Sequence, residues 1–185
     1  MEIIRDKTCS FSGHRPEKLI IKNDCLDFCR KVVKSVLRLA VQDAVNQGYN
    51  TFITGMSRGT DLWAAEAVLD LRVSEKFRDD EIKLVAAIPF PEFGKDFRGE
   101  SLASFKYILR HSDEIIYTSP AYHKDAYKVR NYYMVDNSSK LIAVLKDTVH
   151  HISGTNQTVN YAKRQGLDVQ IIDVNKIEEN FNANH

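Results

Sequence analysis

The sequence predicts an α/β domain of the Rossmann-like type, a three-layer α/β/α arrangement around a mostly parallel sheet of about six strands. Strand-like and helix-like segments alternate along nearly the whole chain, which is typical of right-handed βαβ crossovers. Most strand-like segments are unbroken apolar runs, as expected when helices cover both faces of a sheet. The length of 185 residues fits one domain. No repeat or composition break marks a boundary, so residues 1–185 are predicted to form a single domain with a frayed tail from about residue 175.

Each expected element follows from its local pattern. Short β-prone runs that stop at Gly, Pro or polar turn residues predict strands at 8–12, 51–54, 83–88, 114–118, 140–145 and 168–174. Apolar residues repeated every three or four positions predict helices at 25–47, from 60 through 71, around 102–109, at 126–137 and from about 154 to 165. Asp24 and Thr60 have the residue type and position of N-caps for the first two helices.

Composition excludes several classes of protein. Lys and Arg total 26 against 25 Asp and Glu, so the bulk charge predicts no nucleic-acid partner. The charged N-terminus does not fit a signal peptide, and no apolar run reaches membrane-spanning length. Three cysteines argue against a disulfide framework, and Cys25 and Cys29 are better explained as small buried residues than as a metal pair. We therefore expect a cytoplasmic protein without a membrane partner, a metal or a required cofactor.

The first candidate loop is Gly13-His14-Arg15-Pro16, directly after the first strand. Gly13 permits a sharp turn and a close backbone approach, and Arg15 presents a fork of donors suited to phosphate. A surface turn with a solvated arginine explains the same residues. From this loop alone, both interpretations stay open.

The second candidate loop runs from Gly55 through Met56, Ser57, Arg58 and Gly59 to Thr60 and Asp61, directly before a helix. Two glycines, two hydroxyls and a helix N-terminus together favour an anion-binding nest. The loop has neither the Lys of a Walker loop nor the GxGxxG spacing. Asp61 is explained equally well as a first-turn carboxylate or as an acceptor for a ribose hydroxyl.

Further candidates follow the later strands. Thr118 ends the fourth strand, and Gly154 with Thr155 opens a helix that offers a second seat for phosphate. Arg130 and Asn131 stand on the preceding helix, within reach of the far side of a ligand. Residue type alone favours a surface ion pair for Arg130. One of four tyrosines is available to stack on a base, although most are expected to fill the gap between helix and sheet: Tyr122, Tyr127, Tyr132 and Tyr133.

These motifs carry a resemblance. Ser12-Gly13-His14-Arg15-Pro16, then Thr54-Gly55 with Gly59 and Asp61, then Leu62-Trp63-Ala64-Ala65-Glu66 resemble the YpsA/YoqJ-type family of uncharacterised bacterial and phage proteins. That family belongs to the SLOG superfamily of Rossmann-like domains, which includes the DNA-processing protein DprA and the LOG-type phosphoribohydrolases. The resemblance implies that the Gly13 loop and the Gly55-to-Asp61 loop line a nucleotide pocket.

The resemblance also implies a departure. Arg130 falls where LOG-type enzymes keep an arginine for phosphate or ribose, and Gly154-Thr155 falls at their Gly-rich loop. The glutamate that ends that loop is replaced here by Gln157 or Thr158. Because cleavage of an N-glycosidic bond needs a carboxylate, this loss favours binding over catalysis, with Asp61 as the one weak candidate for a catalytic acid.

The leading hypothesis is thus a sensor of a nucleotide or nucleotide derivative, such as a nucleotide sugar. The alternatives are a hydrolase or transferase acting on the N-glycosidic bond of nucleoside monophosphates, and a protein- or DNA-interaction module on a Rossmann scaffold. Family analogy also suggests a homodimer.

Overall fold

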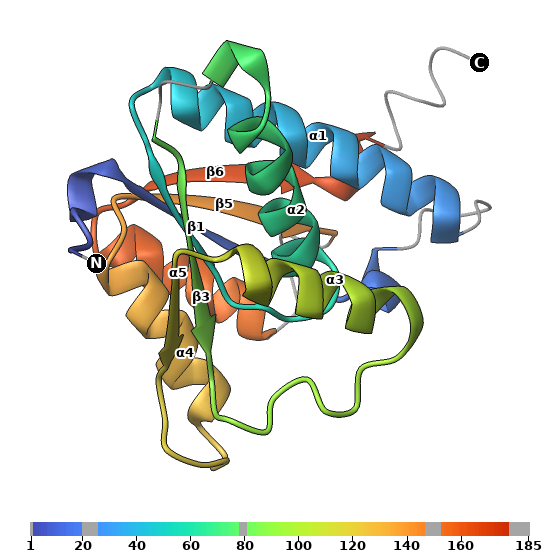
Figure 1. The fold of residues 1–185 in the computed structure, drawn as a ribbon, viewed down its shortest axis with the longest axis vertical. Coiled ribbons are helices and arrows are strands. Elements are labelled where there is room, and N and C mark those ends of the chain that lie inside the picture. The colour runs from blue at the N-terminus through green and yellow to red at the C-terminus, as the bar shows by residue number, and fades with distance from the viewer. Residues whose placement is uncertain (1, 20–25, 78–80, 147–152, 178–185) are drawn as a thin grey trace.

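The computed structural model describes residues 2–19, 26–77, 81–146 and 153–177, apart from the side chains of residues 26–29 (Figure 1). Six strands pair in parallel into one sheet, which confirms the predicted fold class. Their bounds agree with the sequence prediction to within one residue: β1 (Thr8–Gly13), β2 (Thr51–Thr54), β3 (Lys83–Ile88), β4 (Glu114–Tyr117), β5 (Lys140–Leu145) and β6 (Asp168–Asp173).

The strand order is β4-β3-β2-β1-β5-β6. The chain builds outward from β1 to β4 and then crosses back to place β5 on the other side of β1. In register, Ser10 of β1 therefore lies between Ile53 of β2 and Leu141 of β5. The order reverses between β1 and β5, and in open α/β sheets ligands bind outside the carboxyl ends of the strands at this switch point.

Helices cover both faces of the sheet (Figure 1). One face carries α1 (Leu26–Asn46), α2 (Thr60–Arg72) and α3 (Gly99–His111), and the other carries α4 (Ala126–Asp136) and α5 (Gly154–Arg164). Short 3-10 helices lie at Arg5–Lys7, Pro16–Lys18 and Glu75–Phe77.

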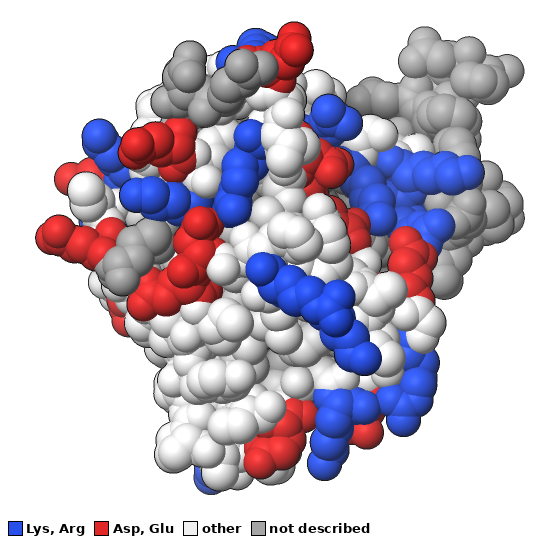
Figure 2. Space-filling model, in the orientation of Figure 1, with Lys and Arg blue, Asp and Glu red and all other residues white. Residues whose placement is uncertain are grey.

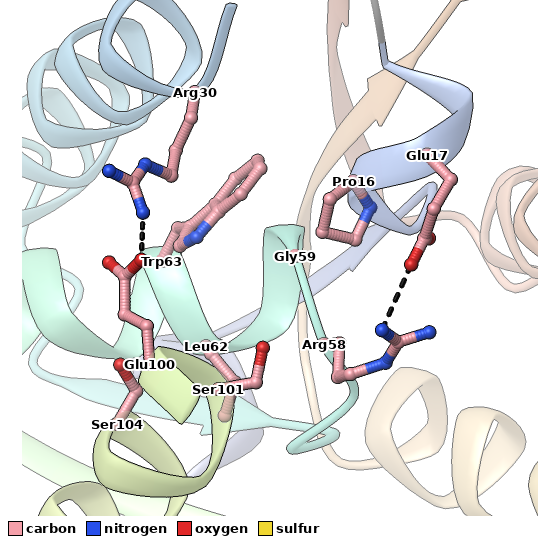
Figure 3. Close-up of a pocket in the computed structure, with 10 residues that line it drawn as sticks. All are labelled: Pro16, Glu17, Arg30, Arg58, Gly59, Leu62, Trp63, Glu100, Ser101 and Ser104. Carbon is pink, nitrogen blue, oxygen red and sulfur yellow. Dashed lines mark hydrogen bonds and ion pairs between the residues drawn. The ribbon is translucent and has the colours of Figure 1, made fainter. Parts of the chain in front are cut away.

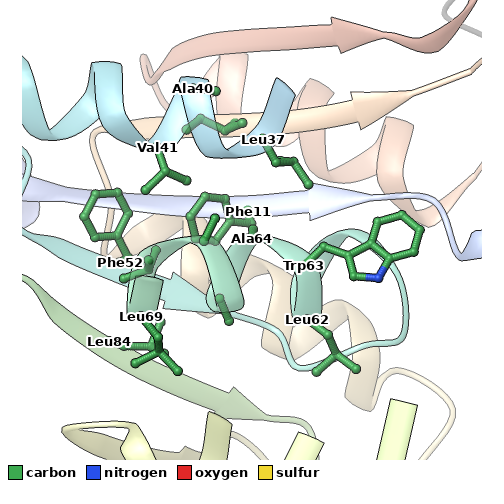
Figure 4. Close-up of a cluster of buried hydrophobic side chains, with 14 of the residues drawn as sticks. Phe11, Leu37, Ala40, Val41, Phe52, Leu62, Trp63, Ala64, Leu69 and Leu84 are labelled. Atoms are coloured by element: carbon green, nitrogen blue, oxygen red, sulfur yellow. The ribbon is translucent and has the colours of Figure 1, made fainter. Parts of the chain in front are cut away.

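The alternation of side chains along β3 divides the core into two layers. Leu84 and Ala86 point toward α1 and α2. There the rings of Phe11 on β1 and Phe52 on β2 stack, with their centroids 6.0 Å apart (Figure 4). Val85 and Ala87 pack with Met134 of α4 on the opposite face. Both layers are buried, because a central parallel strand contributes to two cores at once.

The outer strands depart from this pattern. On β4, Ile115 is 43% exposed and Tyr117 is 53% exposed, and on β6 Ile171 is 37% exposed. The expectation of full cover on both faces therefore fails at the edges of the sheet. An edge strand has a neighbour on one side only, so the helices that span the sheet reach it incompletely.

Three sequence predictions lie wholly or largely outside the described residues: the Asp24 cap, the Cys25–Cys29 pair and the frayed tail from about residue 175. No helix in the described part of the chain is long and apolar enough to cross a membrane.

Cys9 on β1 is fully buried, and this burial raises the pKa of its thiol. At pH 8 we expect no reaction of Cys9 with iodoacetamide in the native protein, because the reactive thiolate is absent and the sulfur is inaccessible. Unfolding in urea restores labelling. Peptide mass mapping separates Cys9 from the other two cysteines, and labelling of native Cys9 within minutes would contradict this picture.

Candidate functional site

A polar cavity of about 290 Å³ lies at the carboxyl ends of the strands, where the order reverses. The loop after β1 forms one wall, the start of α5 forms another, and α4 and the loop after β2 close it. The structure thus brings together residues from four separate segments that the sequence singled out: Gly13, His14, Arg15, Ser57, Asp61, Arg130, Asn131, Gly154 and Thr155.

Five of the predicted residues do not line this cavity. Thr60 is fully buried, and Gly55 packs directly against Arg130. Arg58 and Gly59 face a different cavity. Thr118 follows the edge strand β4, and its hydroxyl donates to the carbonyl of Ile88 at 3.3 Å.

The glycines allow the loops to approach each other closely. A Cβ on Gly13 would lie 2.2 Å from the Thr60 hydroxyl oxygen, and a Cβ on Gly55 would lie 2.2 Å from Nη1 of Arg130. Any larger residue at either position must push a buried group aside.

Thr60 joins the two loops and does not cap α2. The N-cap position belongs to Gly59, whose φ of 85° lies in the left-handed region that favours glycine. The Thr60 hydroxyl donates to the carbonyl of His14 at 3.2 Å. The predicted capping role is therefore wrong, because the hydroxyl has a tertiary partner that the local sequence does not reveal.

Asp61 and Arg130 form a buried ion pair at the base of the cavity. Their Oδ2 and Nη1 atoms are 3.7 Å apart, and both side chains are at least nine-tenths buried. The Ser57 amide donates to Asp61 Oδ2 at 3.2 Å, and Arg130 Nη2 donates to the Ser57 hydroxyl at 3.1 Å. Arg130 is thus not the surface ion pair that residue type favours. Its partner lies 69 positions earlier in the sequence, on α2.

The same arginine begins a chain of hydrogen bonds that reaches α5. Arg130 Nε donates to Asn131 Oδ1 at 2.9 Å, and Asn131 Nδ2 donates to the Thr158 hydroxyl at 2.9 Å. That hydroxyl donates in turn to the carbonyl of Gly154 at 2.8 Å. Thr158, one of the two positions where the resemblance to LOG-type enzymes implies a glutamate, therefore fixes the first turn of α5 relative to α4.

Burial dominates the electrostatics of the ion pair. It raises the pKa of the Asp61 carboxyl, an effect that the charge of Arg130 and the hydrogen bond from the Ser57 amide oppose. Burial also lowers the pKa of Arg130, which Asp61 opposes and nearby Arg15 reinforces. Nη1 of Arg130 has no hydrogen-bond partner among the described residues.

The cavity carries an excess of positive charge. Arg15, Lys18 and Arg130 all line it, whereas Asp61 is the one acidic side chain among its described lining residues. Thr155 and Gly154 add the first turn of a helix, whose amides have no intrahelical partners. The arrangement is suited to an anion.

Sequence reasoning missed three lining residues, Phe11, Lys18 and Ser153. Ser153 is the N-cap of α5, and its hydroxyl accepts the amide of Asn156 at 3.1 Å. A serine just before a predicted helix is a recognisable cap signal. Lys18 ends the 3-10 helix that starts at Pro16, and the turn brings it back toward Arg15.

Two further cavities adjoin these loops. One, of about 690 Å³, has aromatic walls and shares Arg15, Ser57 and Tyr127 with the polar cavity. The other, of about 360 Å³, lies beside Trp63 (Figure 3). Its two arginines are paired with glutamates, Arg58 with Glu17 at 2.9 Å and Arg30 with Glu100.

Comparison with known proteins places the chain in a family. The sequence profile described as the YspA SLOG family (YpsA) matches residues 9–177. The chain belongs to the YpsA family of SLOG proteins. That match spans β1 through β6 and therefore every residue of the polar cavity.

The chain is also similar to curated proteins named UPF0398. A UPF0398 protein of Bacillus thuringiensis (strain Al Hakam) is 27% identical over 145 residues, which cover 75% of this chain and 73% of the relative. A UPF0398 protein of Bacillus cereus (strain B4264) is 26% identical over the same share of each chain. The family resemblance drawn from the Gly13 and Gly55 loops is thus confirmed.

Proposed function

We propose that this protein binds a nucleotide or nucleotide derivative and acts as a sensor of that small molecule. The excess of cationic side chains at the switch point, beside the N-terminus of α5, is the observation that carries the proposal. Phosphate is the anion that such a combination of a glycine loop, an arginine and a helix start accommodates best. Arg15 and the first turn of α5 hold the phosphate, and Ser57 and Asp61 face the sugar.

A small ligand fits the surface better than a nucleic acid does. Acidic and basic side chains are interspersed on the face shown in Figure 2, and the whole chain carries a net charge of +1. Nucleic-acid binding depends on a continuous basic stripe or patch.

Isothermal titration calorimetry with nucleoside monophosphates, cyclic nucleotides and ADP-ribose tests the proposal. We expect Arg15→Ala to weaken the tightest of them about 10-fold or more, since a hydrogen bond to a charged group is worth about 1.5–3 kcal/mol. Arg38→Ala, at an exposed position on α1, serves as the matched control and leaves affinity unchanged. Absence of binding by every member of the panel at millimolar concentration would refute the sensor function.

The raised pKa of Asp61 inside the cavity supports one second candidate, hydrolysis of an N-glycosidic bond. A carboxyl whose pKa is raised by burial is a candidate general acid. Release of free base from nucleoside monophosphates, measured by chromatography and lost in Asp61→Asn, would support this activity. No release by the wild-type protein under conditions in which the nucleotide binds would rule it out.

A further inference from the structure

We infer that the aromatic cavity is the subsite for the base of the ligand, so that the ligand spans both cavities with its phosphate in the polar one. This inference rests on the proposed nucleotide function and names the residues that select the ring. It assigns stacking on the base to Tyr122, whose ring is held in place by Phe90.

The cavity wall is a set of rings packed edge to face. The ring of Phe90 contacts Phe93 at 5.8 Å, Tyr122 at 5.3 Å and Tyr127 at 5.9 Å, with interplanar angles between 80° and 87°. Tyr122 stands at the outer end of this set and is 66% exposed. An exposed ring held in place by a buried one is suited to stacking on a planar base.

The two cavities adjoin each other. Arg15, Ser57 and Tyr127 line both of them. The polar cavity, at about 290 Å³, lies at the lower limit of small-molecule sites, which run from about 300 to 1,000 Å³. A phosphorylated sugar fits that space, and the remainder of a nucleotide requires the adjoining cavity of about 690 Å³.

Polar groups at the rim favour a base over a purely apolar ring. Glu92, Lys95 and Asp96 line the aromatic cavity on the segment that follows β3. Between them they offer donors and acceptors to the edge of a heterocycle. A purely apolar ring would make no use of these groups.

The aromatic wall is also formed in advance. Phe93 and Phe97, on the segment between β3 and α3, contact Phe105 of α3 at 6.1 Å and 5.3 Å. Phe105 is buried, so these contacts anchor the segment to the core. Binding therefore does not have to order the wall, which removes one cost of association.

The test compares short and long probes on the same protein. Calorimetry with ribose 5-phosphate and with AMP, GMP, CMP and UMP measures what the base adds. We expect the tightest nucleotide to bind better than ribose 5-phosphate. Tyr122→Ala should weaken that nucleotide about 5- to 150-fold, the range for loss of one base–aromatic stack. The affinity for ribose 5-phosphate should be unchanged.

Two variants control for other effects. Tyr122→Phe keeps the ring and should retain most of the affinity. Tyr107→Ala removes a tyrosine of 50% exposure on α3 that lines neither cavity, and it should change nothing.

The outcomes test the base subsite separately from the phosphate site. If nucleotides bind no better than ribose 5-phosphate, or if Tyr122→Ala weakens both probes equally, the base subsite is wrong while the phosphate site stands. If the wild-type protein binds neither these probes nor the cyclic nucleotides and ADP-ribose, the proposed function fails and the base subsite fails with it.

Discussion

Replacement of Arg130 by Met should lower the free energy of unfolding by about 3–5 kcal/mol, the usual cost of breaking a buried ion pair. Asp61 would keep its Ser57 hydrogen bond but lose the charge 3.7 Å away that compensates its burial. Met retains much of the volume of Arg, so the loss reports on charge and hydrogen bonding more than on a cavity. Urea unfolding followed by circular dichroism measures it, and nucleotide binding should disappear in the same variant.

The matched control is Arg58→Met, which breaks the pair with Glu17 at 2.9 Å on the surface. Exposed pairs are worth about 0–1 kcal/mol, so this variant should unfold close to the wild-type urea concentration. The double replacement Asp61→Asn with Arg130→Met should cost less than the sum of the two single changes, since the two charges depend on each other. Additive costs would mean that the ion pair does not form.

Replacement of Gly13 by Ala should cost about 3 kcal/mol, toward the upper end of the range for overpacked sites. The new Cβ would stand 2.2 Å from Oγ1, 2.5 Å from Cβ and 2.6 Å from Cγ2 of Thr60. Thr60 is fully buried and branched at Cβ, so it has no free rotamer that relieves all three contacts. The loops after β1 and β2 must therefore separate, and the cavity that they share must deform.

Gly154→Ala is the control for this change. Gly154 also lines the polar cavity, but a Cβ there meets nothing within 4 Å. The free energy of unfolding of the Gly154→Ala variant should change by less than about 1 kcal/mol. Its sign depends on the higher helix propensity of alanine relative to glycine. If Gly13→Ala and Gly154→Ala unfold at the same urea concentration, the close contact between the two loops does not exist.

The sequence by itself determined the architecture. Apolar runs at 83–88 and 140–145 predict central strands because a strand buried on both faces needs apolar residues at every position. Alternation with amphipathic helices then leaves parallel pairing as the simple solution. The loops at Gly13 and Gly55 were also predictable as parts of one site, since parallel strands present their carboxyl ends at one edge of the sheet.

Tertiary structure alone decided what the individual side chains do. Thr60 has the residue type of a cap and Arg130 that of a solvated helix residue, yet one bonds His14 and the other is buried against Asp61. Both outcomes depend on partners more than 40 positions away in sequence, which local propensity does not encode. The aromatic cavity is a further case, because rings from three separate segments meet only after β3 and β4 are in register. The pattern of apolar and polar residues along the chain determines where the loops begin and end. The packing of side chains between those loops determines the chemistry of the space that they enclose.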